Sequence, residues 1–182
     1  MIDVAGNRQA QKYPLRIQAA RAAWAVCRPL FALSPRPLWG WRRFLLRLFG
    51  ATVGREVHIY PSARVFMPWN LAIGDESAVG ERVYLYNLGP LTIGRQVTIS
   101  HQAHLCGGTH DYRQAGFPLV KTPNAIGDSA WICADAFVGP GVTVGARAIV
   151  GARCVAMQDV AQDAIVSGNP AQVIGQRPEI FA

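Results

Sequence analysis

The stretch that decides the fold runs from residue 126 to residue 154 and reads IGDSAWICADAFVGPGVTVGARAIVGARC. An aliphatic residue recurs there at every sixth position, and a small or β-branched residue follows four positions later. The aliphatic series is Ile126, Ile132, Val138, Val144 and Val150. A six-residue period fits neither the turn of a helix nor the alternation of a simple strand. It predicts a solenoid of very short strands, three per coil, each pointing one aliphatic side chain into a narrow core.

The same period extends toward the N-terminus, so the predicted solenoid spans residues 51–170. The earlier aliphatic sets are Val53, Ile59 and Val65, then Ile73, Val79 and Leu85, then Ile93, Ile99 and Leu105. Glycine often follows the aliphatic residue, and we expect it to relieve backbone strain where the chain turns. The expected fold class is therefore all-β.

The six-residue period is interrupted three times, always after the third strand of a coil. The first two coils hold 20 residues each, two more than three hexads, and the next holds 33, which is 15 more. Because successive coils stack about 4.8 Å apart, excursions at the same phase lie along one edge. We therefore expect Trp69, Asn87 and the inserted loop 106–125 to line one wall, where a rigid scaffold carries a functional loop.

The inserted loop reads CGGTHDYRQAGFPLVKTPN from Cys106 to Asn124. Two glycines allow a sharp exit from the strand, and the loop then presents His110. Imidazole titrates near neutrality, so this side chain is a candidate general base. Asp111 either orients His110 or caps the loop.

These features resemble a known family. The hexapeptide repeat, the phrase Gly-Gly-Thr-His-Asp at 107–111 and the segment 130–142 are similar to hexapeptide acetyltransferases. The branch that acetylates colanic acid and related exopolysaccharides also resembles this chain in three further segments, which are 35–43, 68–71 and 167–171. The resemblance covers nearly the whole chain after about residue 30.

The resemblance implies a left-handed parallel β-helix, a homotrimer and active sites between neighbouring subunits. It implies acetyl transfer from acetyl-CoA to a hydroxyl of a sugar or polysaccharide precursor, by direct transfer with His110 as general base and Asp111 beside it. The implied substrate-binding residues are Asn87, Trp69 and Tyr86. The implied cofactor-binding residues are Trp131, Ala134, Ala152 and Arg153. A turn role for Asn87 and a structural role for Trp131 stay open as alternatives.

The last coil departs from the family. Gln158 stands within the segment where relatives often carry Thr-Lys-Asp, and Gln172 and Gly175 stand where basic residues commonly follow. Few basic residues therefore remain to bind the CoA phosphates, and Arg153 or Arg177 would have to replace those that are missing.

The positive charge belongs to the N-terminal segment. Residues 1–55 hold ten Lys and Arg against one acid, for a net +9, and residues 56–182 hold eight against ten, for a net −2. Because residues 56–182 carry no excess of positive charge, this distribution argues against nucleic-acid binding by the solenoid domain. Residues 1–50 are predicted to form a basic amphipathic extension with helices at about 15–27 and 38–49, interrupted at Pro29, and residues 171–182 a C-terminal tail. The Trp- and Arg-rich extension suits peripheral membrane contact through residues 15–49, or a cap on the solenoid, or both.

Four separated cysteines without a CxxC pair indicate reduced thiols, and we see neither a signal peptide nor an apolar run long enough for a bilayer. We therefore expect a cytoplasmic protein, peripheral at most on the inner face of the membrane, with no metal. Two alternatives remain: a non-catalytic hexapeptide scaffold, and a zinc hydratase like the γ-carbonic anhydrases. The second needs three converging histidines, and its candidates are His101, His104 and His110.

Overall fold

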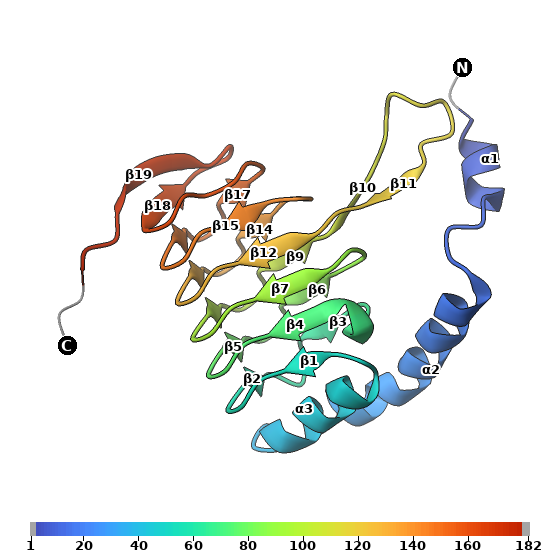
Figure 1. Cartoon of the computed structure of the whole chain (residues 1–182), viewed down its shortest axis with the longest axis horizontal. Helices are drawn as coiled ribbons and strands as arrows, with labels where there is room; N and C mark the ends of the chain where they lie inside the picture. Colours follow the sequence, from blue (N-terminus) through green and yellow to red (C-terminus); the bar gives the residue numbers. More distant parts are fainter. Residues whose placement is uncertain (1–2, 180–182) are drawn as a thin grey trace.

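The computed structural model describes residues 3–179, and three parallel sheets form the sides of a prism along which the chain winds (Figure 1). Sheet A contains β1 (Thr52–Val53), β4 (Leu71–Ile73), β7 (Leu91–Ile93), β12 (Asn124–Ile126) and β15 (Thr143–Val144). Sheet B contains β2 (His58–Ile59), β5 (Ala78–Val79), β8 (Thr98–Ile99), β13 (Trp131–Ile132), β16 (Ile149–Val150), β18 (Ala164–Ser167) and β19 (Gln172–Gln176). Sheet C contains β3 (Arg64–Val65), β6 (Tyr84–Tyr86), β9 (His104–Cys106), β14 (Phe137–Val138) and β17 (Val155–Ala156).

The six-residue series forms the core of the prism. In sheet A, Val53 pairs with Ile73, Ile73 with Ile93, Ile93 with Ile126, and Ile126 with Val144. All five side chains are buried, and so are the corresponding residues of the other two sheets. Because one aliphatic side chain per strand points inward, the coils stack in register. The predicted parallel β-helix with N-terminal helices is confirmed.

The predicted role of the glycines is wrong. The left-handed corners between sheets A and B are occupied by non-glycine residues, for example Gln96 with φ 55° and Arg147 with φ 60°. Glycine is needed two residues earlier for a steric reason, because the next coil passes close by. A Cβ on Gly127 would lie 2.4 Å from the backbone nitrogen of Ala146. The repeat therefore selects glycine for close packing of coils rather than for its conformational freedom.

Two helices close the N-terminal end of the solenoid (Figure 1). Helix α2 (Leu15–Ala32) packs Trp24 and Phe31 against the core, and α3 (Trp39–Leu48) contributes Leu45 and Leu46. The indole nitrogen of Trp24 donates to the carbonyl of Val65 at 2.9 Å, which joins α2 to strand β3. The helices therefore cap the apolar core that the first coil would otherwise expose.

Helix α2 does not stop at Pro29 as predicted but continues through it to Ala32. Proline removes one N–H, whose partner would be the carbonyl of Ala25. Ala25 is exposed, so water can satisfy that carbonyl. A further helix, α1 (Val4–Gln9), lies in the segment predicted to be a loose lead-in. None of the helices in residues 3–179 combines the length and apolar character needed to cross a membrane.

The predicted C-terminal tail contains strand β19, which pairs antiparallel with β18 at the end of sheet B. This pairing covers the last parallel strand, which would otherwise present an open edge.

Candidate active site

The three excursions stack along the edge between sheets C and A. The first is a short 3-10 helix, η1 (Pro68–Asn70), the second follows β6, and the third is the long inserted loop after β9. The side-chain amide of Asn70 donates to the carbonyl of Leu88 at 2.8 Å, and the N–H of Gly89 donates to the carbonyl of Gly107 at 3.3 Å. Each excursion thus contacts the next, and the predicted register along one edge is confirmed.

The inserted loop is an antiparallel arm that projects from the solenoid (Figure 1). Strands β10 (Gly108–His110) and β11 (Leu119–Lys121) pair with His110 opposite Leu119. A Cβ on Gly108 would lie 2.3 Å from the Leu88 side chain, so the second glycine is required where the arm leaves the edge. The arm therefore holds His110 in a strand rather than in an irregular loop.

The orientation of His110 is set by the opposite strand of the arm. Its Nδ1 lies 2.6 Å from the carbonyl oxygen of Phe117. Because a carbonyl oxygen only accepts hydrogen bonds, Nδ1 carries the proton of the neutral imidazole, which leaves the lone pair on Nε2. The side chain is exposed, so Nε2 is accessible to a substrate.

Of the two roles predicted for Asp111, its hydrogen bonds fit the capping role. Its carboxylate accepts from the backbone N–H of Arg113 at 3.0 Å and from the side-chain amide of Gln114 at 2.9 Å. These two bonds, the first more strongly, hold the pKa of Asp111 below its ordinary value. The carboxylate therefore caps the turn of the arm, and the group that contacts Nδ1 of His110 is the carbonyl of Phe117.

Helix α1 holds the turn of the arm from outside. The backbone N–H of Asp3 donates to the carbonyl of Ala115 at 2.7 Å. The side-chain amide of Asn7 donates to the carbonyl of Gly116 at 2.5 Å and also to that of Phe117. Asn7 thus shares with His110 the carbonyl that fixes the imidazole. The sequence carries no signal for this contact because it joins residues 110 positions apart.

We predict that Asn7→Ala lowers kcat about tenfold with little change in KM, because the arm would hold the imidazole less firmly. The matched control is Gln9→Ala on the same helix, which should leave kcat unchanged. Steady-state kinetics of acetyl transfer would check this. An Asn7→Ala enzyme with wild-type kcat would show that the contact is only structural.

The predicted substrate-binding residues lie along the same edge but differ in accessibility. Asn87 is 1% exposed, and its amide bonds both backbone groups of Met67, accepting at 3.0 Å and donating at 2.6 Å. Within one chain it therefore joins two excursions. Trp69 is half-buried against the core beside the end of α3. Tyr86 is half-buried on the outer side of sheet C, and its burial raises the pKa of its hydroxyl.

The predicted CoA-binding residues do not lie on this edge. Trp131 is on sheet B, 44% exposed, and its indole donates to the hydroxyl of Ser100 at 2.9 Å. Ala134 lies at the corner between sheets B and C, and Ala152 and Arg153 lie at the same corner one coil further. There the N–H of Arg153 donates to the carbonyl of Ala134 at 2.9 Å. His110 and these residues are thus on different edges of one prism.

The candidate zinc histidines are dispersed. His104 stacks on Tyr84 within sheet C, whereas His101 is at an exposed corner and His110 on the arm. No three His, Cys, Asp or Glu side chains within residues 3–179 are grouped so that they could hold a metal ion.

Solved structures share this architecture. A hexapeptide-repeat acetyltransferase from Vibrio cholerae superimposes with a TM-score of 0.84 at 27% identity, covering 91% of this chain and 95% of that one. A structure from Vibrio cholerae O1 biovar eltor, complexed with acetyl coenzyme A, gives a TM-score of 0.82 at 26% identity and covers 93% of each chain. No family model matches the sequence. With this shared fold and a curated acetyltransferase relative at 46% identity, the chain belongs to the hexapeptide-repeat acetyltransferases.

Within this family, the chain is similar to a protein named for colanic acid biosynthesis. The colanic acid biosynthesis acetyltransferase WcaF of Escherichia coli strain K12 is 46% identical over 156 residues. The match spans 86% of this chain and 86% of that protein.

Proposed function

We propose that the protein transfers an acetyl group from acetyl-CoA to a hydroxyl of an exopolysaccharide sugar or of its lipid-linked precursor. The observation that carries the proposal is the Nε2 lone pair of His110, held accessible on a rigid arm by the carbonyl of Phe117. The name of the colanic acid relative and the acetyl-CoA bound to the Vibrio cholerae neighbour support the acceptor class and the donor.

The proposed reaction is a direct transfer. Nε2 of His110 takes the proton of the sugar hydroxyl while its oxygen attacks the thioester carbonyl carbon, and the C–O bond forms. The tetrahedral intermediate then collapses, the C–S bond breaks, and the imidazolium returns its proton to the leaving thiolate. No acyl-enzyme forms, because both substrates are held together.

We also propose that the site forms between subunits of a homotrimer. His110 projects from the edge between sheets C and A, whereas Ala134 and Ala152 lie at another corner, so one chain does not bring them together. A neighbouring chain would place its corner beside the arm. The small side chains there suit an extended pantetheine chain, and Arg153, which lies 3.8 Å from the Asp135 carboxylate and is 85% exposed, could reach a phosphate.

The activity itself is tested by incubating the protein with acetyl-CoA and purified exopolysaccharide repeat units. Free thiol release and the mass of the acceptor are measured together. Acceptor-dependent thiol release with one acetyl group gained per acceptor is expected. A protein that binds but never acetylates any repeat unit would instead be the non-catalytic scaffold.

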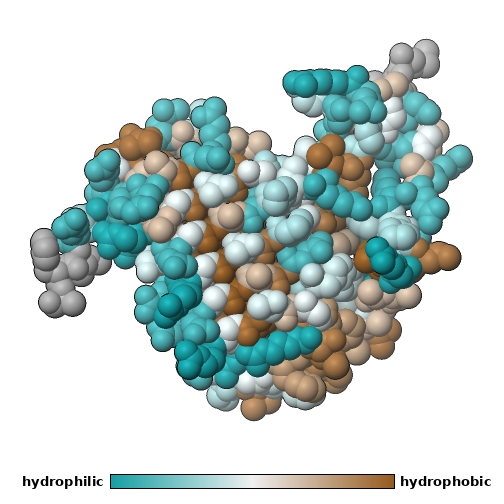
Figure 2. Space-filling view, in the orientation of Figure 1, coloured by the Kyte–Doolittle hydropathy of each residue, from teal (hydrophilic) through white to brown (hydrophobic). Residues whose placement is uncertain are grey.

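We further propose that the outer faces of α2 and α3 contact an anionic membrane surface. Apolar side chains are exposed on both helices, among them Val26 and Leu33 at 77% and 84%, and Phe44 and Leu48 at 53% and 66%. Figure 2 shows apolar surface over the end of the molecule that α3 closes. Residues 15–49 contain seven arginines and no acid, and of these arginines Arg42 is buried. A second copy of this face would therefore be repelled, whereas anionic lipids match both its charge and its apolar stripe.

We predict that the double variant Phe44→Glu/Leu48→Glu binds vesicles of phosphatidylethanolamine and phosphatidylglycerol about tenfold more weakly than wild type, because two apolar contacts are lost. The matched control is Val173→Glu/Ile174→Glu on β19, where both side chains are 68% exposed. Sedimentation with the vesicles measures binding. Equal sedimentation of both variants, or self-association that only the first variant abolishes, would contradict membrane contact.

A further inference from the structure

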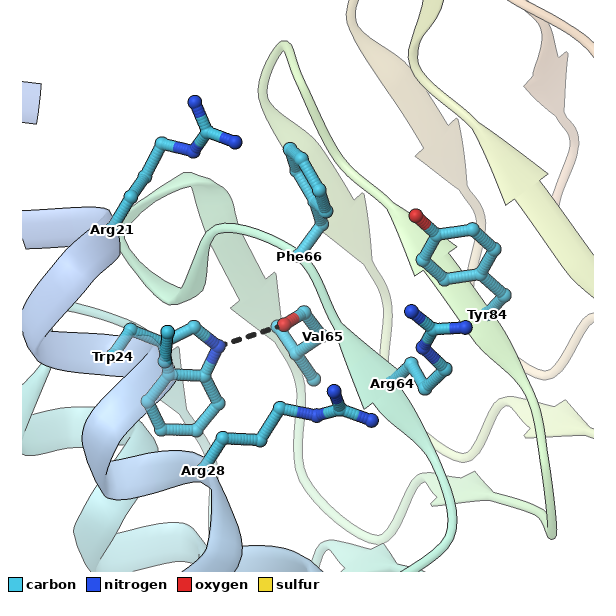
Figure 3. Close-up of a pocket in the computed structure, with 8 residues that line it drawn as sticks. Arg21, Trp24, Arg28, Arg64, Val65, Phe66 and Tyr84 are labelled. Carbon is cyan, nitrogen blue, oxygen red and sulfur yellow. Dashed lines mark hydrogen bonds between the residues drawn. The ribbon is translucent and has the colours of Figure 1, made fainter. Parts of the chain in front are cut away.

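A cationic pocket lies between α2 and the outer side of sheet C (Figure 3). Its volume is about 190 Å³. Three arginines and three aromatic residues define it, namely Arg21, Arg28, Arg64, Trp24, Phe66 and Tyr84. The hydrogen bond from Trp24 to the carbonyl of Val65 fixes the helix against the strand at its base. The function proposed above assigns no role to this pocket.

The three arginines have no anionic partner. No carboxylate in residues 3–179 lies within ion-pair distance of Arg21, Arg28 or Arg64. Arg28 enters from α2 and Arg64 from β3, and both extend into the same space (Figure 3). Like charges around one hollow repel each other, and a bound anion relieves that repulsion. Guanidinium groups match phosphate oxygens with paired hydrogen bonds.

Aromatic rings keep two of these guanidinium groups in place. Arg64 lies over the ring of Tyr84 with its Cζ 4.9 Å from the centroid, and Arg21 lies 5.3 Å from the centroid of Phe66. Such stacking restricts the long side chains, so less entropy is lost when an anion binds. Burial raises the pKa of the Tyr84 hydroxyl, which therefore stays protonated and able to donate.

The pocket is connected to the catalytic arm by charge. The Cζ of Arg21 also lies 4.6 Å from the centroid of the Tyr13 ring, and the Nζ of Lys121 lies 4.3 Å from the same centroid. Lys121 pairs with Gly108 on the arm, two residues before His110. Cations therefore extend from the pocket toward His110. His110 is four residues along the arm from Cys106, which is about 13 Å in an extended strand. The pocket lies on the solenoid below the arm, so it would bind a part of the acceptor that is remote from the reacting hydroxyl.

We propose that this pocket binds the diphosphate of a saccharide-diphosphate acceptor and thereby directs the far end of the attached saccharide chain toward His110; the proposal rests on the acetyl transfer proposed above. The diphosphate belongs either to a lipid carrier or to a nucleotide. The lipid source suits the position of the pocket on α2, the helix whose opposite face is exposed and apolar.

Calorimetric titration of the full-length protein with inorganic pyrophosphate tests the pocket without acetyl-CoA or turnover. The double variant Arg28→Gln/Arg64→Gln should bind pyrophosphate at least about tenfold more weakly than wild type. The matched control is Arg55→Gln/Arg95→Gln, which removes the same charge from the corner between sheets A and B and should bind like wild type. His110→Ala should also bind like wild type, so the result is independent of the proposed catalysis.

Two further titrations distinguish the source of the diphosphate. Farnesyl diphosphate binding more tightly than UDP-glucose indicates a lipid carrier, and the reverse order indicates a nucleotide; either order supports the pocket if the Arg28→Gln/Arg64→Gln variant loses the preference. In turnover, that variant should raise KM for the diphosphate acceptor with kcat unchanged, since remote binding is lost equally from ground and transition states. Equal pyrophosphate affinity in both double variants, or loss of CoA binding in place of pyrophosphate binding, would overturn the proposal.

Discussion

Replacing His110 with alanine is expected to lower kcat for acetyl transfer about 1,000-fold, while KM for acetyl-CoA changes little. The imidazole of His110 is exposed on the arm, and the Phe117 carbonyl holds it in the tautomer that leaves Nε2 free to accept a proton. Alanine removes the base but leaves the pairing of the arm intact, since that pairing uses backbone groups. Initial-rate measurements over a range of both substrates would separate kcat from KM.

His58→Ala is the matched control, because this exposed histidine lies on β2 in the first coil, away from both the arm and the corner that holds Ala134 and Ala152. Its kcat should equal that of wild type. Wild-type kcat in His110→Ala would remove the proposed general base, and an equal loss in both variants would point to a general effect on folding.

Replacing Arg42 with methionine is expected to lower the free energy of unfolding by about 3–5 kcal/mol. Arg42 is completely buried between α3 and the first coil. Its guanidinium donates to the carbonyls of Ile59 at 2.5 Å, Pro35 at 2.9 Å and Arg36 at 2.5 Å, and to the hydroxyl of Ser34 at 2.8 Å. Methionine fills much of the volume but leaves these four acceptors without their donor. Urea unfolding followed by circular dichroism measures the difference.

Arg43→Met is the matched control on the same helix. Arg43 makes one hydrogen bond, to the carbonyl of Val57 at 3.1 Å, and lies 3.9 Å from the exposed carboxylate of Glu56. Its replacement should cost about 1 kcal/mol or less. Similar losses in the two variants would show that Arg42 does not anchor the helical cap.

The solenoid and the alignment of its excursions could be predicted because both depend on a strict period. Each coil repeats the same inward positions, so a residue count gives the edge on which Trp69, Asn87 and His110 emerge. The strands of the arm were not predicted, since their pairing is local to an insertion that breaks the period. Contacts between distant segments were also not predictable, as the bond from Asn7 to Phe117 illustrates.

The net charge of a segment did not predict which of its charged side chains are exposed. Residues 1–55 carry a net charge of +9, yet Arg42 is buried and Arg47 donates to the carbonyl of Val53 at 3.0 Å. Composition gives the sum of charges, whereas packing decides which of them reach solvent. Asp111 shows the same limit, because its neighbour in sequence is His110 but its hydrogen-bond partners are in the turn.

A crystal structure of the protein with coenzyme A bound tests the central claim most directly. We predict the sulfur of CoA beside Nε2 of His110 from one subunit, with the pantetheine along Ala134 and Ala152 of the adjacent subunit. A sulfur remote from every His110 in the assembly, or a coenzyme bound entirely within one chain on another face, would contradict the account.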